Sequence, residues 1–125
     1  MKRILVTGCN GQLGRAINEE YKNDNVTLIN TDVAELDITK VDEVLSFVEK
    51  ERPDVIINCA AHTNVNACET QFDLAFLINA IGPRNLSIAA SKIGAKMIHV
   101  STDYVFDGSA IEPYTEFSPV APLGA

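Results

Sequence analysis

The chain has 125 residues, enough for one domain with a hydrophobic core but small for an α/β enzyme. Its 46% of hydrophobic and 22% of charged residues are ordinary for a soluble globular protein, and no apolar run reaches the length of a membrane span. The formal net charge of -7 argues against nucleic acid or an anionic membrane as the main partner. Thr7-Gly8 cuts the apolar stretch that follows Lys2-Arg3 far too short for a signal peptide, so we expect a cytoplasmic protein.

Hydrophobic periodicity alternates along the whole chain between the pattern of buried strands and that of amphipathic helices. In chain order it predicts a strand at 3–7, a helix at 12–21, strands at 26–30 and, very short, at 35–38, a helix at 41–50, a strand at 54–59, a helix at 72–91 and a strand at 96–100. Strands that alternate with helices imply a parallel sheet with right-handed crossovers. The proline-containing stretch 109–125 is predicted to be loop.

Local signals refine two of the helices. Thr39 is the predicted N-cap of the helix 41–50. Gly82-Pro83 is expected to bend the long helix or to join two pieces of it, and Gly94 is its predicted C-cap.

The three cysteines, Cys9, Cys59 and Cys68, lack the spacing of a metal site, and we predict no bound metal. Reduced thiols in or near packed elements are the expected state in a cytosolic protein. Only Cys9 lies beside a predicted helix start, a position that can lower the pKa of a thiol.

Three glycines, Gly8, Gly11 and Gly14, lie three residues apart between the first predicted strand and the first helix. In this context a glycine motif forms a phosphate-binding turn, because the free N–H groups and the dipole of a helix N-terminus favour an anion. Gly8 would make the tight turn, Gly11 would let a pyrophosphate approach, and Gly14 would let the helix pack on the strand. A glycine-rich turn without a ligand is the alternative. No Gly-Lys-Ser/Thr follows the third glycine, which argues against a nucleoside triphosphate loop.

Asp32 favours a dinucleotide as the ligand. It follows the second strand and lies eighteen residues beyond Gly14, where a carboxylate can accept hydrogen bonds from an adenosine ribose. An aspartate in a solvated loop is the alternative. The carboxylate disfavours the 2′-phosphate of NADPH, but an arginine elsewhere could offset it, so NADH and NADPH both stay open.

Three stretches of the sequence resemble a known family. TGCNGQLG at 7–14 is similar to the cofactor fingerprint of extended short-chain dehydrogenases/reductases. NCAAHT at 58–63 and STDYVFDG at 101–108 resemble the corresponding stretches of the dTDP-4-dehydrorhamnose reductases within that superfamily. The resemblance runs through essentially the whole chain and implies a Rossmann-type, doubly wound parallel sheet with strand order 3-2-1-4-5.

The resemblance also implies roles for residues at the carboxyl ends of the predicted strands. Those expected to bind NADPH or NADH are Gly8, Asn10, Gly11, Gln12, Leu13 and Gly14 near the pyrophosphate, Asp32 and Val33 near the ribose, Asp37 and Ile38 near the adenine, Ala60, Ala61 and His62 after the fourth strand, and Asn79 on the long helix. Asp103 and Tyr104 are expected to border the substrate, a dTDP-sugar, and Thr102 to belong to the Ser/Thr-Tyr-Lys catalytic set.

Several of these residues have a purely structural explanation as well. His62 fits a histidine that is hydrogen-bonded at a strand end, and its own sequence context favours that explanation. Thr102 fits an ordinary cap between a strand and a loop, and Asn79 a polar group in helix packing. Only their joint placement at the carboxyl ends of successive parallel strands favours a functional role, because ligands bind there in open α/β sheets.

The activity that the resemblance implies is NAD(P)H-dependent reduction of the 4-keto group of dTDP-4-dehydrorhamnose, in the biosynthesis of dTDP-rhamnose for cell-surface polysaccharides. In this family a tyrosine of a Y-x-x-x-K motif protonates the substrate oxygen, the lysine lowers the pKa of that tyrosine, and the equivalent of Thr102 holds the carbonyl. None of the three tyrosines, Tyr21, Tyr104 and Tyr114, is followed by lysine four residues later.

We therefore expect residues 1–125 to be the amino-terminal, NAD(P)-binding part of a longer reductase, with the substrate-binding region absent and no useful activity alone. The resemblance is compatible with a homodimeric parent protein. Two other functions stay open. One is a non-catalytic NADP-binding regulatory protein, since the regulatory subunit of methionine adenosyltransferase resembles the same family, and the other is a reductase or epimerase of another nucleotide sugar.

Overall fold

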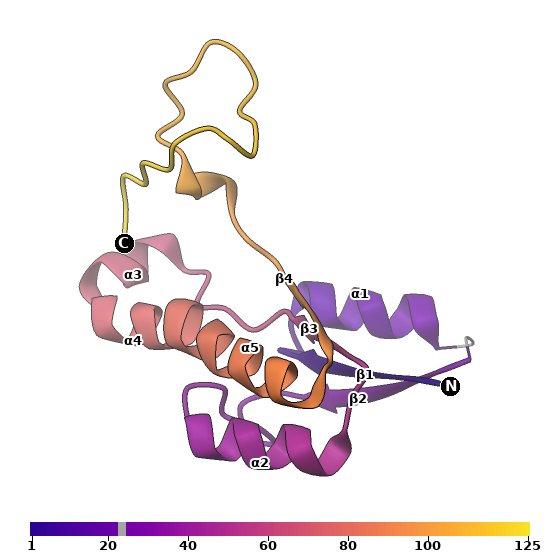
Figure 1. The fold of residues 1–125 in the computed structure, drawn as a ribbon. Helices are drawn as coiled ribbons and strands as arrows, with labels where there is room; N and C mark the ends of the chain where they lie inside the picture. Colours follow the sequence, from indigo (N-terminus) through magenta and orange to yellow (C-terminus); the bar gives the residue numbers. More distant parts are fainter. Residues whose placement is uncertain (23–24) are drawn as a thin grey trace.

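Within residues 1–22 and 25–125, which the computed structural model describes, four parallel strands form one sheet (Figure 1). They are β1 (Lys2–Thr7), β2 (Val26–Thr31), β3 (Val55–Asn58) and β4 (Lys96–His99), in the order β2-β1-β3-β4. The predicted Rossmann-type parallel sheet is confirmed. The register brings the last residues of the strands side by side, with Thr7 opposite both Thr31 and Asn58, and Asn58 opposite His99.

Helices cover both faces of this sheet. The chain crosses the sheet in opposite directions between β1 and β2 and between β2 and β3, so right-handed connections put α1 (Gln12–Tyr21) and α2 (Val41–Glu51) on opposite faces (Figure 1). α5 (Gly82–Ile93) packs beside α2. The helices predicted at 12–21 and 41–50 are thus confirmed. No helix of the described residues is long and apolar enough to cross a membrane.

Shorter helical segments follow β3 and β4. They are α3 (Val65–Thr70), α4 (Phe72–Phe76), the π-helix η1 (Leu77–Ile81) and the 3-10 helix η2 (Asp103–Val105). The sequence did not predict α3, because six residues are too few to show a helical apolar period. Its one signal is the N-cap Asn64, whose side chain accepts a 3.0 Å hydrogen bond from the N–H of Ala67.

The hydrophobic core lies between the sheet and the helix pair α2 and α5. Leu5 of β1 and Ile56 of β3 are paired neighbours, and both are fully buried against Val44, Val48 and Leu86 of the two helices. Burying each of these side chains contributes about 1.5–3 kcal/mol. The core therefore holds the strands in the register that aligns their carboxyl ends.

The very short strand predicted at 35–38 is wrong, and the sheet has the predicted order 3-2-1-4-5 without its outermost strand. Leu36 and Ile38 are buried in the core, as their alternation suggests, but they reach it from turns. The N–H groups of Glu35 and Leu36 both bond to the carbonyl of Asp32, at 3.1 and 2.9 Å. Because local turns satisfy these backbone groups, the segment does not need to join the sheet.

The predicted N-cap of α2 is also wrong. Lys40 is the N-cap, and the hydroxyl of Thr39 donates a 2.6 Å hydrogen bond to Asp37 Oδ1 instead. The N–H of Thr39 donates to the same oxygen at 3.0 Å. These bonds, chiefly the one from the hydroxyl, hold the pKa of Asp37 below its usual value. A carboxylate is a stronger hydrogen-bond acceptor than a neutral group, which explains why the hydroxyl turns toward it.

The helix predicted at 72–91 consists of joined pieces, one of the two expected outcomes. α4 passes into η1, and α5 begins at Gly82 with Pro83 in its first turn, where the missing N–H of proline costs nothing. A Cβ on Gly82 would lie 2.5 Å from Cδ1 of Ile38. The joint therefore packs tightly on the loop that follows β2.

Gly94 is the C-cap of α5, as predicted, and its backbone is left-handed with φ +71°. Among residues 1–22 and 25–125, no heavy atom beyond Gly94 and its chain neighbours lies within 4 Å of the position that a Cβ would take, so backbone strain is what opposes a side chain there. We expect Gly94→Ala to lower the free energy of unfolding by about 1 kcal/mol. Urea denaturation measures this difference, and an unchanged midpoint would contradict the assigned cap.

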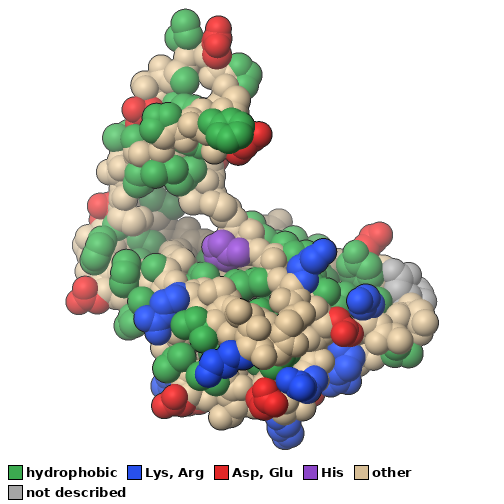
Figure 2. Space-filling view, viewed as in Figure 1, with side chains coloured by type: hydrophobic (Ala, Val, Ile, Leu, Met, Phe, Trp, Pro, Cys, Tyr) green, Lys and Arg blue, Asp and Glu red, His purple; other side chains and the backbone are tan. Residues whose placement is uncertain are grey.

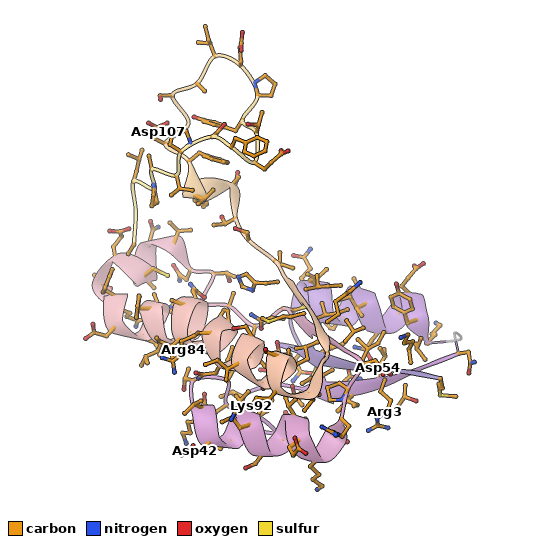
Figure 3. The ribbon with its side chains drawn as sticks, viewed as in Figure 1. Arg3, Asp42, Asp54, Arg84, Lys92 and Asp107 are labelled. Carbon is orange, nitrogen blue, oxygen red and sulfur yellow. The ribbon has the colours of Figure 1, made fainter. Side chains whose placement is uncertain are left out.

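The segment after β4 stands apart from the sheet (Figure 1), and apolar side chains gather along it (Figure 2). Residues 109–125 form turns and loop, as predicted. Asp107, labelled in Figure 3, accepts bonds at Oδ1 from the N–H and hydroxyl of Ser109 and from the hydroxyl of Tyr114, which lower the pKa of Asp107. The rings of Phe106 and Tyr114 stack with centroids 4.3 Å apart. Asp107 and the ring stack together give this exposed loop a defined shape.

Candidate functional site

Two glycines of the motif, Gly8 before α1 and Gly14 within it, are required by the packing of the protein itself. Gly8 has a left-handed backbone with φ +63°, and a Cβ there would lie 2.7 Å from the backbone N of Ala60. A Cβ on Gly14 would lie 2.5 Å from the carbonyl oxygen of Gly8. Gly8 therefore lets the loop turn against the residues that follow β3, and Gly14 lets α1 approach that loop closely.

Gly11 is different from the other two glycines. It is the exposed N-cap of α1, its φ of -75° and ψ of 176° suit any residue, and its Cβ would approach only the carbonyl oxygen of Gly8, at 3.3 Å. A side chain at this position therefore needs the Gly8 carbonyl to move by a few tenths of an ångström, a much smaller change than Gly8 or Gly14 would require. The absence of a side chain keeps open the space in front of the helix N-terminus, where the first N–H groups have no partner within the helix.

A cleft of about 320 Å³ opens at the carboxyl ends of β1, β2 and β3. Eight of the predicted cofactor-binding residues line it: Gly8, Gly11, Asp32, Val33, Asp37, Ile38, Ala60 and Ala61. Five other residues line it that were not predicted to bind the cofactor: Thr7, Leu36, Thr39, Cys59 and Ile78. The remaining predicted cofactor-binding residues lie outside this lining: Asn10, Gln12, Leu13, Gly14, His62 and Asn79. The cleft thus brings together the residues predicted for the ribose, the adenine and part of the glycine loop.

Asp32 ties the glycine loop to the end of β2. Its Oδ2 accepts the N–H of Asn10 at 3.2 Å, and its Oδ1 accepts the N–H of Val33 at 2.8 Å. Its own N–H donates to Glu35 Oε2 at 2.8 Å. A carboxylate has about four acceptor positions, so two remain for a ligand in the cleft. The side chain is therefore oriented before any ligand binds.

The loop after β2 forms one wall of the cleft, and α5 fixes this loop in place. Asn85, which is fully buried, donates from Nδ2 to the carbonyl of Ile38 at 2.9 Å, and its oxygen accepts from Arg84 at 3.0 Å. Together with the hydrogen bonds between Thr39 and Asp37, this contact fixes the cleft wall. The sequence did not identify Asn85, since nothing in the local pattern shows that its partner lies 47 residues away.

The floor of the cleft depends on Asn58, the last residue of β3, which is 1% exposed. Its Oδ1 accepts the hydroxyl of Thr7 at 2.5 Å and the N–H of Ala60 at 3.2 Å. Asn58 thereby joins the ends of two strands to a residue that lines the cleft. A polar residue at the end of a buried apolar strand is the signal that could have identified it.

His62 and Asn79 form a clamp beside the cleft. The N–H of His62 donates to Asn79 Oδ1 at 2.8 Å, and Asn79 Nδ2 donates to the carbonyl of His62 at 3.0 Å. The imidazole Nε2 lies 2.9 Å from Gln71 Oε1. These contacts match the structural explanations given for both residues, and they fix the segment after Ala61 against η1.

The three residues predicted to face the substrate follow β4 and are exposed. The Oγ1 of Thr102 accepts the N–H of Tyr104 at 3.2 Å and so caps η2. Tyr104 is 65% exposed, and Asp103 begins the 3-10 turn. The hydroxyl of Thr102 itself donates to Asp103 Oδ1 at 3.5 Å, a long contact that a substrate carbonyl would have to replace.

The helix start near Cys9 does not lower the pKa of its thiol. Partial burial raises the pKa of its thiol, and the carboxylates of Asp32 and Glu35 raise it further. Burial also raises the pKa of Cys59. In the described part of the chain, no three His, Cys, Asp or Glu side chains come together as a metal site.

The entire chain, residues 1–125, matches the family model of the RmlD substrate binding domain. The chain belongs to the RmlD family. This RmlD-family chain is 56% identical to a dTDP-4-dehydrorhamnose reductase from Clostridium acetobutylicum, whose crystal structure superposes with a TM-score of 0.96 over 98% of this chain and 44% of that one.

Two further relatives agree with this assignment. The crystal structure of a dTDP-4-dehydrorhamnose reductase from Bacillus anthracis in complex with NADP is 45% identical, with a TM-score of 0.95 over 99% of this chain and 44% of that one. The dTDP-4-dehydrorhamnose reductase of Aggregatibacter actinomycetemcomitans is 40% identical over 98% of this chain and 42% of its own length. The resemblance inferred from the sequence is confirmed. The chain spans less than half the length of each of these relatives.

Proposed function

We propose that this chain supplies the nicotinamide-dinucleotide site of an NAD(P)H-dependent reductase that acts on dTDP-4-dehydrorhamnose in the cytoplasm, within the biosynthesis of dTDP-rhamnose for polysaccharides. The dinucleotide part of the proposal rests on the cleft and the glycine loop. The choice of a dTDP-sugar rests on similarity to reductases with that name from three bacteria.

Gly11 is the observation that carries the proposal. The backbone conformation at Gly11 does not require glycine, and packing constrains it only through one tight contact with the Gly8 carbonyl oxygen at 3.3 Å, so a ligand that must come close accounts for glycine there. The position also faces the N-terminus of a helix of ten residues, which attracts an anion such as a pyrophosphate. The residues present therefore fit a dinucleotide.

The residues of the chain would divide the work of holding this ligand. The N–H groups of the first turn of α1 would bind the pyrophosphate, and the Asp32 carboxylate would accept hydrogen bonds from the ribose. Ile38 and the neighbouring wall would shield the adenine from water. When bound, the nicotinamide supplies a hydride to the carbonyl carbon of the sugar. Thr102 would then donate a hydrogen bond to the carbonyl oxygen.

Isothermal titration calorimetry of the chain with NADPH, and separately with NADH, tests the proposed site. We expect saturable binding of one nucleotide per chain. ADP-ribose serves as a control, because it offers the same pyrophosphate and ribose without the nicotinamide. The absence of binding by all three ligands would contradict the proposed site.

Asp32 is expected to influence which of the two nucleotides binds more tightly. The charged residues that line the described cleft are Asp32 and Asp37, both acidic, and a carboxylate beside the ribose repels a 2′-phosphate. We expect Asp32→Asn to strengthen NADPH binding relative to NADH by about tenfold, because asparagine can still accept the N–H of Asn10 without the charge. The ratio of the two Kd values measures this effect, and Asp37→Asn is the matched control. An unchanged ratio would place the 2′ position away from Asp32.

A further inference from the structure

Three polar side chains form a hydrogen-bonded row across the sheet, at the floor of the cleft. Thr7, Asn58 and His99 are the last residues of β1, β3 and β4, and the strand register sets them side by side. The hydroxyl of Thr7 lies 2.5 Å from Asn58 Oδ1, and Asn58 Nδ2 lies 3.1 Å from His99 Nδ1. Thr7 and Asn58 are almost fully buried, whereas His99 lies on the exposed side.

One backbone group determines which atoms donate and which accept along these three side chains. The N–H of Ala60 can only donate, and it points at Asn58 Oδ1 at 3.2 Å, so that atom is the amide oxygen. The other end of the Asn58 amide is therefore its NH₂ group, which donates toward His99. Consequently His99 Nδ1 must accept, and its ring proton must lie on Nε2.

This arrangement links His99 to two parts of the candidate site. Ala60 and Thr7 both line the cleft, and both donate hydrogen bonds to Asn58 Oδ1. His99 contacts the NH₂ group of the same amide and so sets the orientation of that oxygen. Thr102 lies three residues beyond His99 on the same segment. His99 is thus placed between the floor of the cleft and the residues predicted to face the sugar.

We propose that His99 is a positioning residue whose neutral imidazole, protonated on Nε2, accepts from Asn58 at Nδ1 and thereby fixes Ala60 and Thr7 in the floor of the nucleotide cleft. The consequence for nucleotide affinity rests on the proposed function, whereas the tautomer and the position of Ala60 do not. If the acceptor is removed, the Asn58 amide loses the contact that orients it, and the N–H of Ala60 loses a fixed partner.

Nuclear magnetic resonance of the uniformly ¹⁵N-labelled chain tests the first part without any nucleotide. Long-range proton–nitrogen correlations distinguish the two neutral tautomers, and we expect the proton of His99 on Nε2. His62 provides an internal reference ring in the same spectrum. A proton on Nδ1 of His99 in the folded chain would overturn the proposal.

Two variants test the positioning role. His99→Leu removes the acceptor while keeping an apolar side chain of similar reach, and His99→Asn keeps an acceptor near the position of Nδ1. We expect the leucine variant to shift the backbone amide resonance of Ala60 and to weaken NADPH binding about threefold to tenfold, the cost of one lost hydrogen bond. The asparagine variant should restore both. Thermal melts should show both variants folded, because His99 is exposed.

The outcomes separate this proposal from the proposed function. An unmoved Ala60 resonance in the leucine variant, or an asparagine variant that behaves like the leucine variant, overturns the role of His99. If the unmodified chain binds no nucleotide but the tautomer and the Ala60 resonances behave as expected, the positioning role is supported and the proposed function is overturned. If either variant does not fold, the tautomer in the unmodified chain still decides the proposal.

Discussion

Replacing Gly11 with valine is expected to abolish most nicotinamide-dinucleotide binding while leaving the chain folded. The backbone at Gly11 suits any residue, and a Cβ there meets only the carbonyl oxygen of Gly8, at 3.3 Å. We expect the loss of stability to be about 1 kcal/mol or less, the usual cost of a poor N-cap residue. The branched side chain would instead occupy the space in front of the helix where the pyrophosphate must approach. A 100-fold weakening, about 2.7 kcal/mol, is the expected size of the effect on Kd.

Calorimetry with NADPH and a thermal melt of the same sample separate binding from folding in this experiment. Gly14→Ala is the matched control, because its Cβ would lie 2.5 Å from the carbonyl oxygen of Gly8 and must displace backbone. That variant should lose stability first and affinity only as a consequence. Equal affinities for Gly11→Val and the unmodified chain would contradict the approach of a pyrophosphate at Gly11.

The contrast among these glycines shows what a motif can predict. Their spacing in the sequence predicts a turn between a strand and a helix, and that prediction needs no coordinates. The assignment of separate roles needs the coordinates, because Gly8 is constrained by Ala60, which lies 52 residues further along the chain. Only the structure distinguishes Gly11, where a Cβ would meet one backbone oxygen at 3.3 Å, from Gly8 and Gly14, where it would meet backbone atoms at 2.7 and 2.5 Å.

The helix and strand positions were predictable for a similar physical reason. β1 and β3 are short apolar runs because both faces of a parallel strand are covered, and α2 shows an apolar stripe because one side packs on the sheet. The segment 35–38 misled the prediction, because two buried residues in alternation can also project from turns. Its backbone hydrogen bonds go to local partners, and local partners are not visible in an apolar pattern.

The polar framework of the site was the least predictable part. Asn58, Asn85 and His99 each contact a residue that is adjacent only through strand register or helix packing: Thr7, Ile38 and Asn58, respectively. A single sequence contains no measure of register, so such partners cannot be paired in advance. Residues that line the cleft through their own loop, such as Asp32, were predictable because their place after a strand already implies their position.

The chain itself, mixed with NADPH and dTDP-4-dehydrorhamnose, is expected to show no more than about 1% of the turnover of a full-length reductase such as the Clostridium acetobutylicum relative. Reduction of a carbonyl needs a proton for the oxygen, and a positioned general acid contributes about 10²–10⁴-fold. In the family that this chain resembles, that acid is a tyrosine with a lysine four residues later. Tyr21, Tyr104 and Tyr114 have asparagine, glycine and serine at that place.

Thr102 is a poor substitute for such an acid. Its hydroxyl oxygen already accepts the N–H of Tyr104 at 3.2 Å, and a neutral aliphatic hydroxyl can hold a carbonyl by a hydrogen bond far better than it can release a proton. The decrease in absorbance of NADPH at 340 nm measures turnover, and calorimetry on the same sample shows whether the nucleotide binds. Turnover close to that of the full-length reductase would assign the acid to Thr102 or Tyr104. Thr102→Val and Tyr104→Phe would then identify which of them donates the proton, since each removes one hydroxyl and keeps the shape of the side chain.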